Sequence, residues 1–189
     1  MNKPNDYDKV QKLTDGGLPA GGYICRIVRV TEAVSKKSGR EMLKVALDID
    51  EGEYAGYYAD RYDRDSRMER KWPCIFYQLT QNKDGDTSRG LKTFCEDVKE
   101  SNGMDELPWG AGFCEGLRGK LIGVVFGREQ YQRQDGQLGM STKPRSWKTV
   151  DEIRNCKYRV PEDKLLDTSQ SSSTAPQGFD AISDEDLPF

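Results

Sequence analysis

Basic side chains gather in three stretches of this sequence, residues 35–44, 57–77 and 128–148, and aromatic side chains are interleaved with them in the last two. An exposed ring can stack on a nucleic-acid base, which contributes roughly 1–3 kcal/mol per base, while Lys and Arg neutralise phosphates regardless of base identity. This pattern favours a surface that holds a single strand of nucleic acid without reading its sequence. The candidate contact residues are Lys36, Lys37, Arg40, Lys44, Tyr58, Arg61, Tyr62, Arg64, Arg70, Lys71, Trp72, Tyr77, Tyr131, Arg133, Lys143, Arg145, Trp147 and Lys148.

Several kinds of chemistry are excluded by composition. The chain contains no histidine, which removes Ser-His-Asp triads, Cys-His pairs and histidine-ligated metals. Its five cysteines stand singly, without a Cys-x-x-Cys pair, so we expect reduced cysteines that pack in the core rather than disulfides or a zinc site. No cofactor or metal is expected.

An enzymatic alternative rests on the segment "DRYDRD", which brings Asp60, Asp63 and Asp65 close together in sequence. Clustered carboxylates hold the metal ions of two-metal nucleases. Each of these acids has an Arg neighbour, which favours surface ion pairs instead. We therefore expect a protein that is not an enzyme, with a Mg²⁺-dependent nuclease as an alternative.

The elements that must position these residues follow from hydrophobic periodicity. Leu91, Phe94, Cys95 and Val98 have helical spacing, with Thr87 or Ser88 as the cap and Asn102-Gly103 as the end. The segment 61–71 is interpreted as a short helix or an excursion within the third strand, and 150–155 as a helical turn. Strands are predicted at 23–30, 41–49, 74–79, 120–127 and 140–150, with Pro144 placing part of the last strand at an edge or bulge.

Three strands, a helix and two strands predict an all-β fold with one helix, the five-stranded Greek-key barrel called the OB-fold. Another five-stranded α+β domain and an SH3-like barrel remain alternatives. An OB-fold binds ligands across strands two and three and through the loops 1–2 and 4–5, where the candidate residues fall. We expect Tyr23 and Phe126 in the core, and Trp109 as a plug at one end of the barrel.

Charge divides the chain into a body and a tail. Residues 165–189 contain five acids and no base, a charge of −5, while the other 164 residues contain 29 bases and 27 acids, a charge of +2. No apolar run reaches the roughly 18–20 residues that span a bilayer, and the polar start does not resemble a signal peptide, so we expect a cytoplasmic protein. The predicted organisation is a flexible N-terminus (1–17), a domain (18–164), a disordered linker (165–179) and an acidic tip (180–189).

The tip carries the most specific motif, Asp184, Glu185, Asp186, Leu187, Pro188 and Phe189. With the linker and the predicted domain, it resembles the bacterial and phage single-stranded DNA-binding proteins, whose tips end in a few acids, an aliphatic residue, Pro and Phe. The body is similar, more loosely, to the phage and mobile-element members through "LPAGGY", "GEYAGYY" and "GKLIGVVFGREQY".

This resemblance implies a protein that coats exposed single strands in DNA replication, recombination or repair. It implies that replication or recombination proteins bind the tip, where an apolar pocket would take the Phe ring. A homo-oligomer is compatible with the resemblance, but the long third-strand region and the segment after the fifth strand depart from the family. The alternative from another class is an OB-fold adaptor whose groove binds protein.

Overall fold

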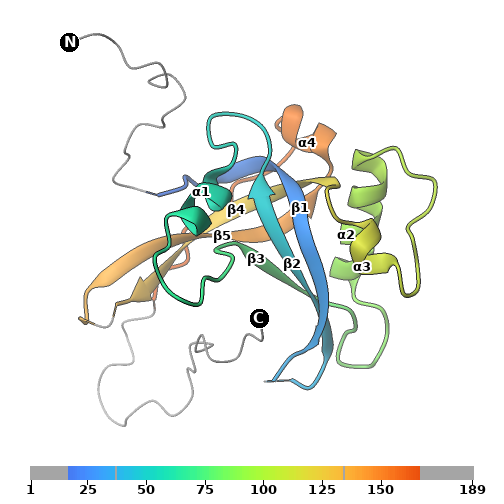
Figure 1. Ribbon diagram of the computed structural model, residues 1–189, viewed down its shortest axis with the longest axis horizontal. Helices are drawn as coiled ribbons and strands as arrows, with labels where there is room; N and C mark the ends of the chain where they lie inside the picture. The colour runs from blue at the N-terminus through green and yellow to red at the C-terminus, as the bar shows by residue number, and fades with distance from the viewer. Residues whose placement is uncertain (1–16, 37, 134, 167–189) are drawn as a thin grey trace.

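Five antiparallel strands form one sheet in the order β3-β2-β1-β4-β5 (Figure 1). The computed structural model describes residues 17–36, 38–133 and 135–166. The strands are β1 (Gly21–Val34), β2 (Glu41–Ile49), β3 (Ile75–Leu79), β4 (Leu121–Gln132) and β5 (Leu138–Lys148). The helices are α1 (Tyr57–Asp63), α2 (Arg89–Ser101), α3 (Phe113–Gly116) and α4 (Val150–Arg154). The described chain is therefore mostly β, as expected; α2 and α4 lie where a helix and a helical turn were predicted, α1 overlaps the segment interpreted as a short helix or an excursion, and α3 was not predicted.

Strand β2 shows why the sheet has one buried face. Its residues Leu43, Val45, Leu47 and Ile49 are buried, and the residues between them are half-buried. Because side chains alternate along a strand, this pattern directs one row into the core and the other row outward. A bulge in β1 between Ile27 and Arg29 interrupts its pairing with β2.

Residues 122–127 of strand β4 form a continuous run that is buried on both faces. Val124 and Phe126 lie in the main core, and Phe126 meets Tyr23 edge to face with the ring centroids 5.5 Å apart. On the other face, Val125 packs with Val150 and Ile153 of α4. Helix α4 thus covers the face of β4 that is turned away from the main core.

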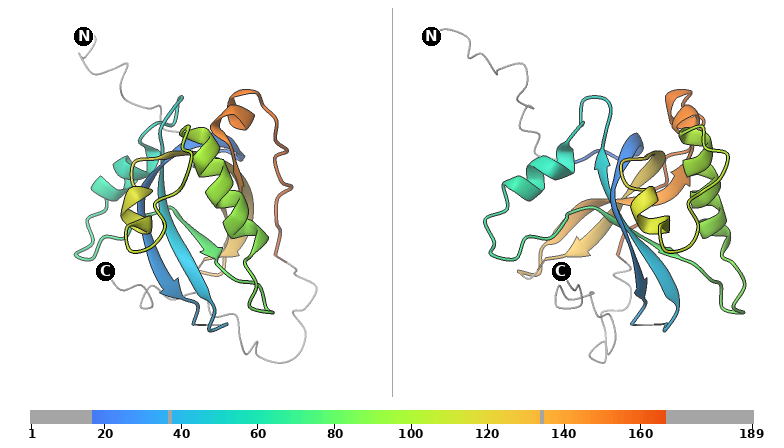
Figure 2. Two further views of the ribbon diagram at one scale, coloured as in Figure 1. Left: turned by 90° about the vertical axis from the view of Figure 1, so that its right-hand side faces the viewer. Right: turned by 45° about the vertical axis from the view of Figure 1, so that its right-hand side comes forward.

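Helix α2 begins and ends where the sequence indicates. The hydroxyl of Ser88 accepts a hydrogen bond from the backbone N–H of Leu91 at 3.0 Å, and Asn102 is the C-cap. Phe94 and Val98 are fully buried against the sheet. Figure 2 shows α2 running alongside the sheet, with α3 next to it and α1 on the far side.

The seam between β3 and β5 is joined by side chains. Within the described residues no hydrogen-bonded ladder connects these two strands, so the sheet is open at this point. The indole Nε1 of Trp147 donates a hydrogen bond to Oε1 of Gln78 at 2.9 Å, and its ring stacks on Phe76 with centroids 4.0 Å apart. Phe94 packs against the same indole at 4.8 Å. Trp147 therefore links both ends of the sheet to α2.

Trp147 faces inward because β5 carries a bulge. Its register with β4 shifts between Val125, which pairs with Ser146, and Phe126, which pairs with Pro144. The extra residue, Arg145, reverses the alternation for the rest of the strand. The predicted irregularity at Pro144 is thus confirmed.

Three of the five cysteines pack in the core as expected, whereas Cys114 is half-buried and Cys156 is exposed. All five are free, and Cys25, Cys74 and Cys95 are buried. Burial raises the pKa of the Cys74 thiol to about 12 and that of Cys95 to about 11, so both are protonated at neutral pH. No helix among the described residues is long and apolar enough to cross a membrane.

We predict that Trp147→Phe lowers the free energy of unfolding by about 1–3 kcal/mol, because it leaves the buried Oε1 of Gln78 without its donor. Urea denaturation measures the change. The matched control is Trp109→Phe, because that indole is 65% exposed against 5% for Trp147. A loss at Trp147 no larger than at Trp109 would contradict the role of the seam.

A second prediction concerns Asp97 on α2. Burial raises the pKa of this carboxyl to about 6; Glu152, Glu100 and Glu96 add to the rise and Lys148 opposes it. Within the described part of the chain, Oδ2 of Asp97 is buried and accepts no hydrogen bond. Its folded pKa exceeds the value of about 3.9 in an unfolded chain, so the carboxylate opposes folding above about pH 6 and stops doing so below about pH 4.

Asp97→Asn should therefore stabilise the protein by about 1 kcal/mol at pH 7, a value reduced for the partial exposure of the residue. The gain should shrink as the pH falls from 6 and vanish near pH 4, as followed by urea denaturation across this range. Asp84→Asn, at an exposed position in the loop before α2, serves as the control because Asp84 does not contribute to the pKa of Asp97. A gain that persists at pH 4 would rule out the titration of Asp97 as its cause.

Candidate nucleic-acid interface

The outward row of β2 continues across both neighbouring strands. Lys44 pairs with Thr31 of β1 and Tyr77 of β3, so these three side chains form one line across the sheet. The lines on either side are Arg29, Ala46 and Ile75, and Ala33, Met42 and Leu79. We call these nine positions the outer face. They carry two cations, one tyrosine and small or apolar side chains, and no acid.

Tyr77 and Lys44 give the outer face its binding chemistry. Tyr77 is 38% exposed and lies in register with half-buried Lys44, so an aromatic ring and an ammonium group are neighbours on adjacent strands. Directly opposite residues in an antiparallel pair have Cβ atoms about 4.5–5.5 Å apart. A single base and its phosphate could contact both side chains.

Trp72 and Tyr62 form an aromatic pair next to β2, which we call the aromatic ledge. The Nε1 of Trp72 donates a hydrogen bond to the backbone oxygen of Leu47 at 2.8 Å, which fixes the indole against β2. The ring of Tyr62 lies 5.4 Å from that of Trp72, and the guanidinium of Arg70 lies over the Tyr62 ring at 4.9 Å. These stacking contacts order the segment between α1 and β3.

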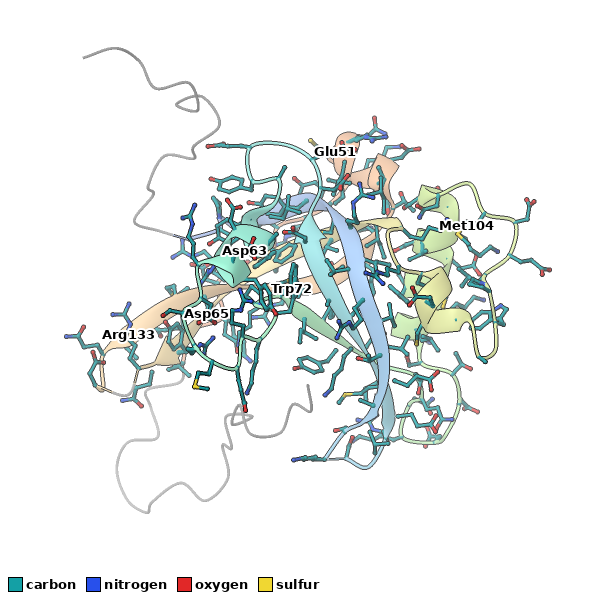
Figure 3. All side chains as sticks on the ribbon, in the orientation of Figure 1. Glu51, Asp63, Asp65, Trp72, Met104 and Arg133 are labelled. Carbon is teal, nitrogen blue, oxygen red and sulfur yellow. The ribbon has the colours of Figure 1, made fainter. Side chains whose placement is uncertain are left out.

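Two hairpins extend from the sheet, and each carries predicted contact residues. In the β1–β2 turn Lys36 is exposed and Arg40 is half-buried, while Lys37 lies outside the described residues. At the β4–β5 turn Arg133 is exposed, and Figure 3 shows it at the end of that hairpin. Lys71, also a predicted contact, is half-buried beside Trp72.

Basic side chains gather around one acid on the β4–β5 hairpin. The carboxylate of Glu129 forms ion pairs with Lys143 at 3.6 Å, Arg145 at 3.2 Å and Lys164 at 3.2 Å. Burial by itself would raise the pKa of Glu129, but the hydrogen bond from Lys164 and the two other cations outweigh burial and lower it. Three cations against one carboxylate leave this cluster with a formal charge of +2. Exposed Tyr131 lies nearby, in register with Gly139.

Other predicted contact residues serve local structure. Lys148 pairs with Glu152 at 2.8 Å, and Glu152 belongs to the capping box that starts α4. Arg61 donates a hydrogen bond to the hydroxyl of Tyr57 at 3.1 Å. Arg64 pairs with Asp60 at 3.8 Å. Both arginines are exposed, so these two contacts are weak and either guanidinium could bind a phosphate instead.

Two of the predicted contact residues belong to the core. Tyr58 is 4% exposed and stacks on Phe126, with the ring centroids 6.3 Å apart. It points inward from helix α1, which ends at Asp63 and so overlaps only the first three residues of the segment 61–71 that was interpreted as a short helix or a strand excursion. Trp147 is 5% exposed because of the bulge in β5. Neither ring can stack on a base in this structure, so both are removed from the interface.

The acids of the nuclease alternative do not converge. Hydrogen bonds from the guanidinium of Arg67, at 2.6 and 2.9 Å to Oδ2, and one from its backbone N–H lower the pKa of Asp65 to about 2. Asp60 pairs with Arg64. No group of three or more acids or cysteines within the described residues is placed to hold a metal ion.

Sequence reasoning missed the contribution of β1. Arg29 and Thr31 are exposed on the outer face, in line with Ala46 and Lys44. The signal was available in the alternation of Arg29 and Thr31 with buried Val30. The bulge after Ile27 hides the alternation when the strand is scanned from its start.

Comparison with known proteins gives a family without a described activity. The sequence profile of a family described as a protein of unknown function (DUF669) matches residues 5–105, more than half of the chain. The chain belongs to this family. No curated protein matches the sequence.

Proposed function

We propose that this member of the DUF669 family binds single-stranded DNA across the outer face of β1, β2 and β3. The observation that carries the proposal is the alignment of Thr31, Lys44 and Tyr77 across three paired strands, beside the ledge of Trp72 and Tyr62. A strand lying on this face would stack bases on the rings and set phosphates against Lys44 and Arg29. No acid among the nine positions would repel it.

The proposed architecture is an OB-fold. The order β3-β2-β1-β4-β5 with α2 between β3 and β4 supports it, because a barrel of this topology would close between β3 and β5. The contacts of Trp147 with Gln78 and Phe76 bridge that seam in place of a hydrogen-bonded ladder. The hairpin turns with Arg40 and Arg133 would then be the two loops that flank a bound strand.

The proposed role is to coat exposed strands in DNA replication, recombination or repair and to recruit partner proteins through residues 184–189. Positive charge neutralises any phosphate backbone, and rings stack on any base, so such binding is tolerant of sequence. The tip lies outside the described residues, and its recruitment of partners stays a prediction based on its sequence.

We predict that Lys44→Gln combined with Tyr77→Leu weakens binding of a fluorescein-labelled oligo-dT about tenfold or more, since one stacking contact and one phosphate contact are lost. Anisotropy titrations at several salt concentrations measure the affinity. The salt dependence should also fall, by about 0.7 in the slope of log affinity against log salt. Duplex DNA of equal length should bind more weakly than the single strand.

Trp109→Ala is the matched control, since Trp109 lies in the segment between α2 and α3, outside the outer face. Its affinity for oligo-dT should equal that of the unmodified protein. The proposal fails if the unmodified protein does not bind oligo-dT at low salt. It also fails if the double variant binds as tightly as the control.

A separate prediction concerns the tip. Deletion of Leu187, Pro188 and Phe189 should leave oligo-dT affinity unchanged within about twofold, because these residues add no cation to the interface. Pull-down from a bacterial extract with DNA-loaded protein should lose replication or recombination proteins upon deletion. Deletion of Ser171–Ser173 from the predicted linker is the control. Equal recovery with both variants would contradict recruitment through the tip.

A further inference from the structure

Trp109 is exposed although an indole is among the most apolar side chains. It is 65% exposed, against the expectation that it would plug one end of a barrel. Its ring lies parallel to that of Phe113, with an angle of 11° and a centroid distance of 5.0 Å. Phe113 itself is buried, so the core supports one face of the indole while the other face is open.

The backbone around Trp109 is fixed by packing. Pro108 presses on Gly116 so closely that a Cβ atom there would lie 2.3 Å from the proline Cγ. Leu107 is buried, and its backbone oxygen accepts a hydrogen bond from the N–H of Trp109 at 2.8 Å. A ligand of this ring would therefore meet a side chain that is already held in place, which reduces the entropic cost of binding.

Acidic residues surround this aromatic position. Residues 96–115 contain six acids and one base, a formal charge of −5. Asp105, Glu106 and Glu115 are exposed in the segment that holds Trp109, and the nearby Arg118 pairs with Glu115 at 3.5 Å. This charge repels nucleic-acid phosphates and attracts cations.

We propose that the Trp109 platform, defined as residues 105–115, binds an Arg- or Lys-bearing segment of a partner protein. A guanidinium or ammonium group would stack on the open indole face, where cation–π attraction is strongest for tryptophan. The flanking carboxylates would pair with further cations of the same segment. A strand-binding ring would need basic neighbours, which this one lacks within residues 105–115.

The platform adjoins β1 on the side opposite to the outer face, because α3 packs against this strand and Cys114 lies against Glu32, which alternates with the outer-face residues Thr31 and Ala33. Figure 1 shows the segment between α2 and α3 at one side of the molecule and the β4–β5 hairpin extending to the other. Figure 3 places Met104 and Arg133 on these opposite sides. A partner on the platform would leave the outer face accessible. This interaction does not depend on strand binding and would stand if that proposal failed.

The test uses the full chain and a fluorescein-labelled Arg-Gly repeat peptide, with a Glu-Gly repeat peptide for comparison. Anisotropy should rise with the basic peptide and not with the acidic one. Trp109→Ala should weaken binding about fivefold. The double substitution Asp105→Asn and Glu106→Gln should weaken binding to a similar extent. Added salt should lower the affinity for the basic peptide.

The control is Asp84→Asn with Asp86→Asn, which removes the same charge from the exposed loop before α2. Thermal unfolding checks that Trp109→Ala remains folded, and Trp109→Phe, which keeps a ring, should retain most of the affinity. Equal weakening by the control pair would overturn the proposal, since general acidity would explain the binding. Loss of self-association in Trp109→Ala would also overturn the proposal, because the platform would then bind a second copy of the chain. Loss of oligo-dT affinity in this variant would overturn it as well, because the platform would then bind a nucleic-acid strand.

Discussion

The contact of Trp147 with Gln78 and Phe76 is the interaction on which the rest of the structure depends. It joins β5 to β3, the two strands at opposite ends of the sheet order, and brings Phe94 of α2 onto the same indole. A buried indole N–H needs a partner, and Gln78 supplies one from a strand 69 positions away in sequence. With this seam held by inward side chains, the opposite row of β3, which includes Tyr77, is left to face outward.

The alternation of inward and outward side chains along the strands explains which parts of the site could be predicted from the sequence. Local signals were sufficient for α2, where Ser88 caps the helix and Phe94 and Val98 have helical spacing, and for β2, where apolar residues recur with period two. Lys44 was placed on the outward row for that reason. Its alignment with Tyr77 and Thr31 depends on strand register, which is a property of long-range pairing and not of any local pattern.

Trp147 and Tyr58 show where local reasoning failed. Regular alternation along β5 would put Lys143, Arg145 and Trp147 on one face. The bulge at Arg145 turns the tryptophan into the core. Pro144 indicated an irregularity but not its effect on later residues. Tyr58 was grouped with basic neighbours near the third strand, whereas helix α1 directs it against Phe126. The prediction for Trp109 was wrong in the opposite sense. This indole was expected to plug one end of a barrel, but it stacks on buried Phe113 and stays exposed.

Two surfaces of the protein differ in charge, an outer face without acids and an acidic platform around Trp109, and we propose that single strands bind the outer face. Photo-crosslinking to an oligonucleotide containing 5-bromodeoxyuridine, followed by mass spectrometry of the peptides, tests this directly. We expect crosslinks at Tyr77 and in the segment that includes Tyr62 and Trp72, and none at Trp109. Crosslinks concentrated between α2 and α3, with none on β3, would contradict the account.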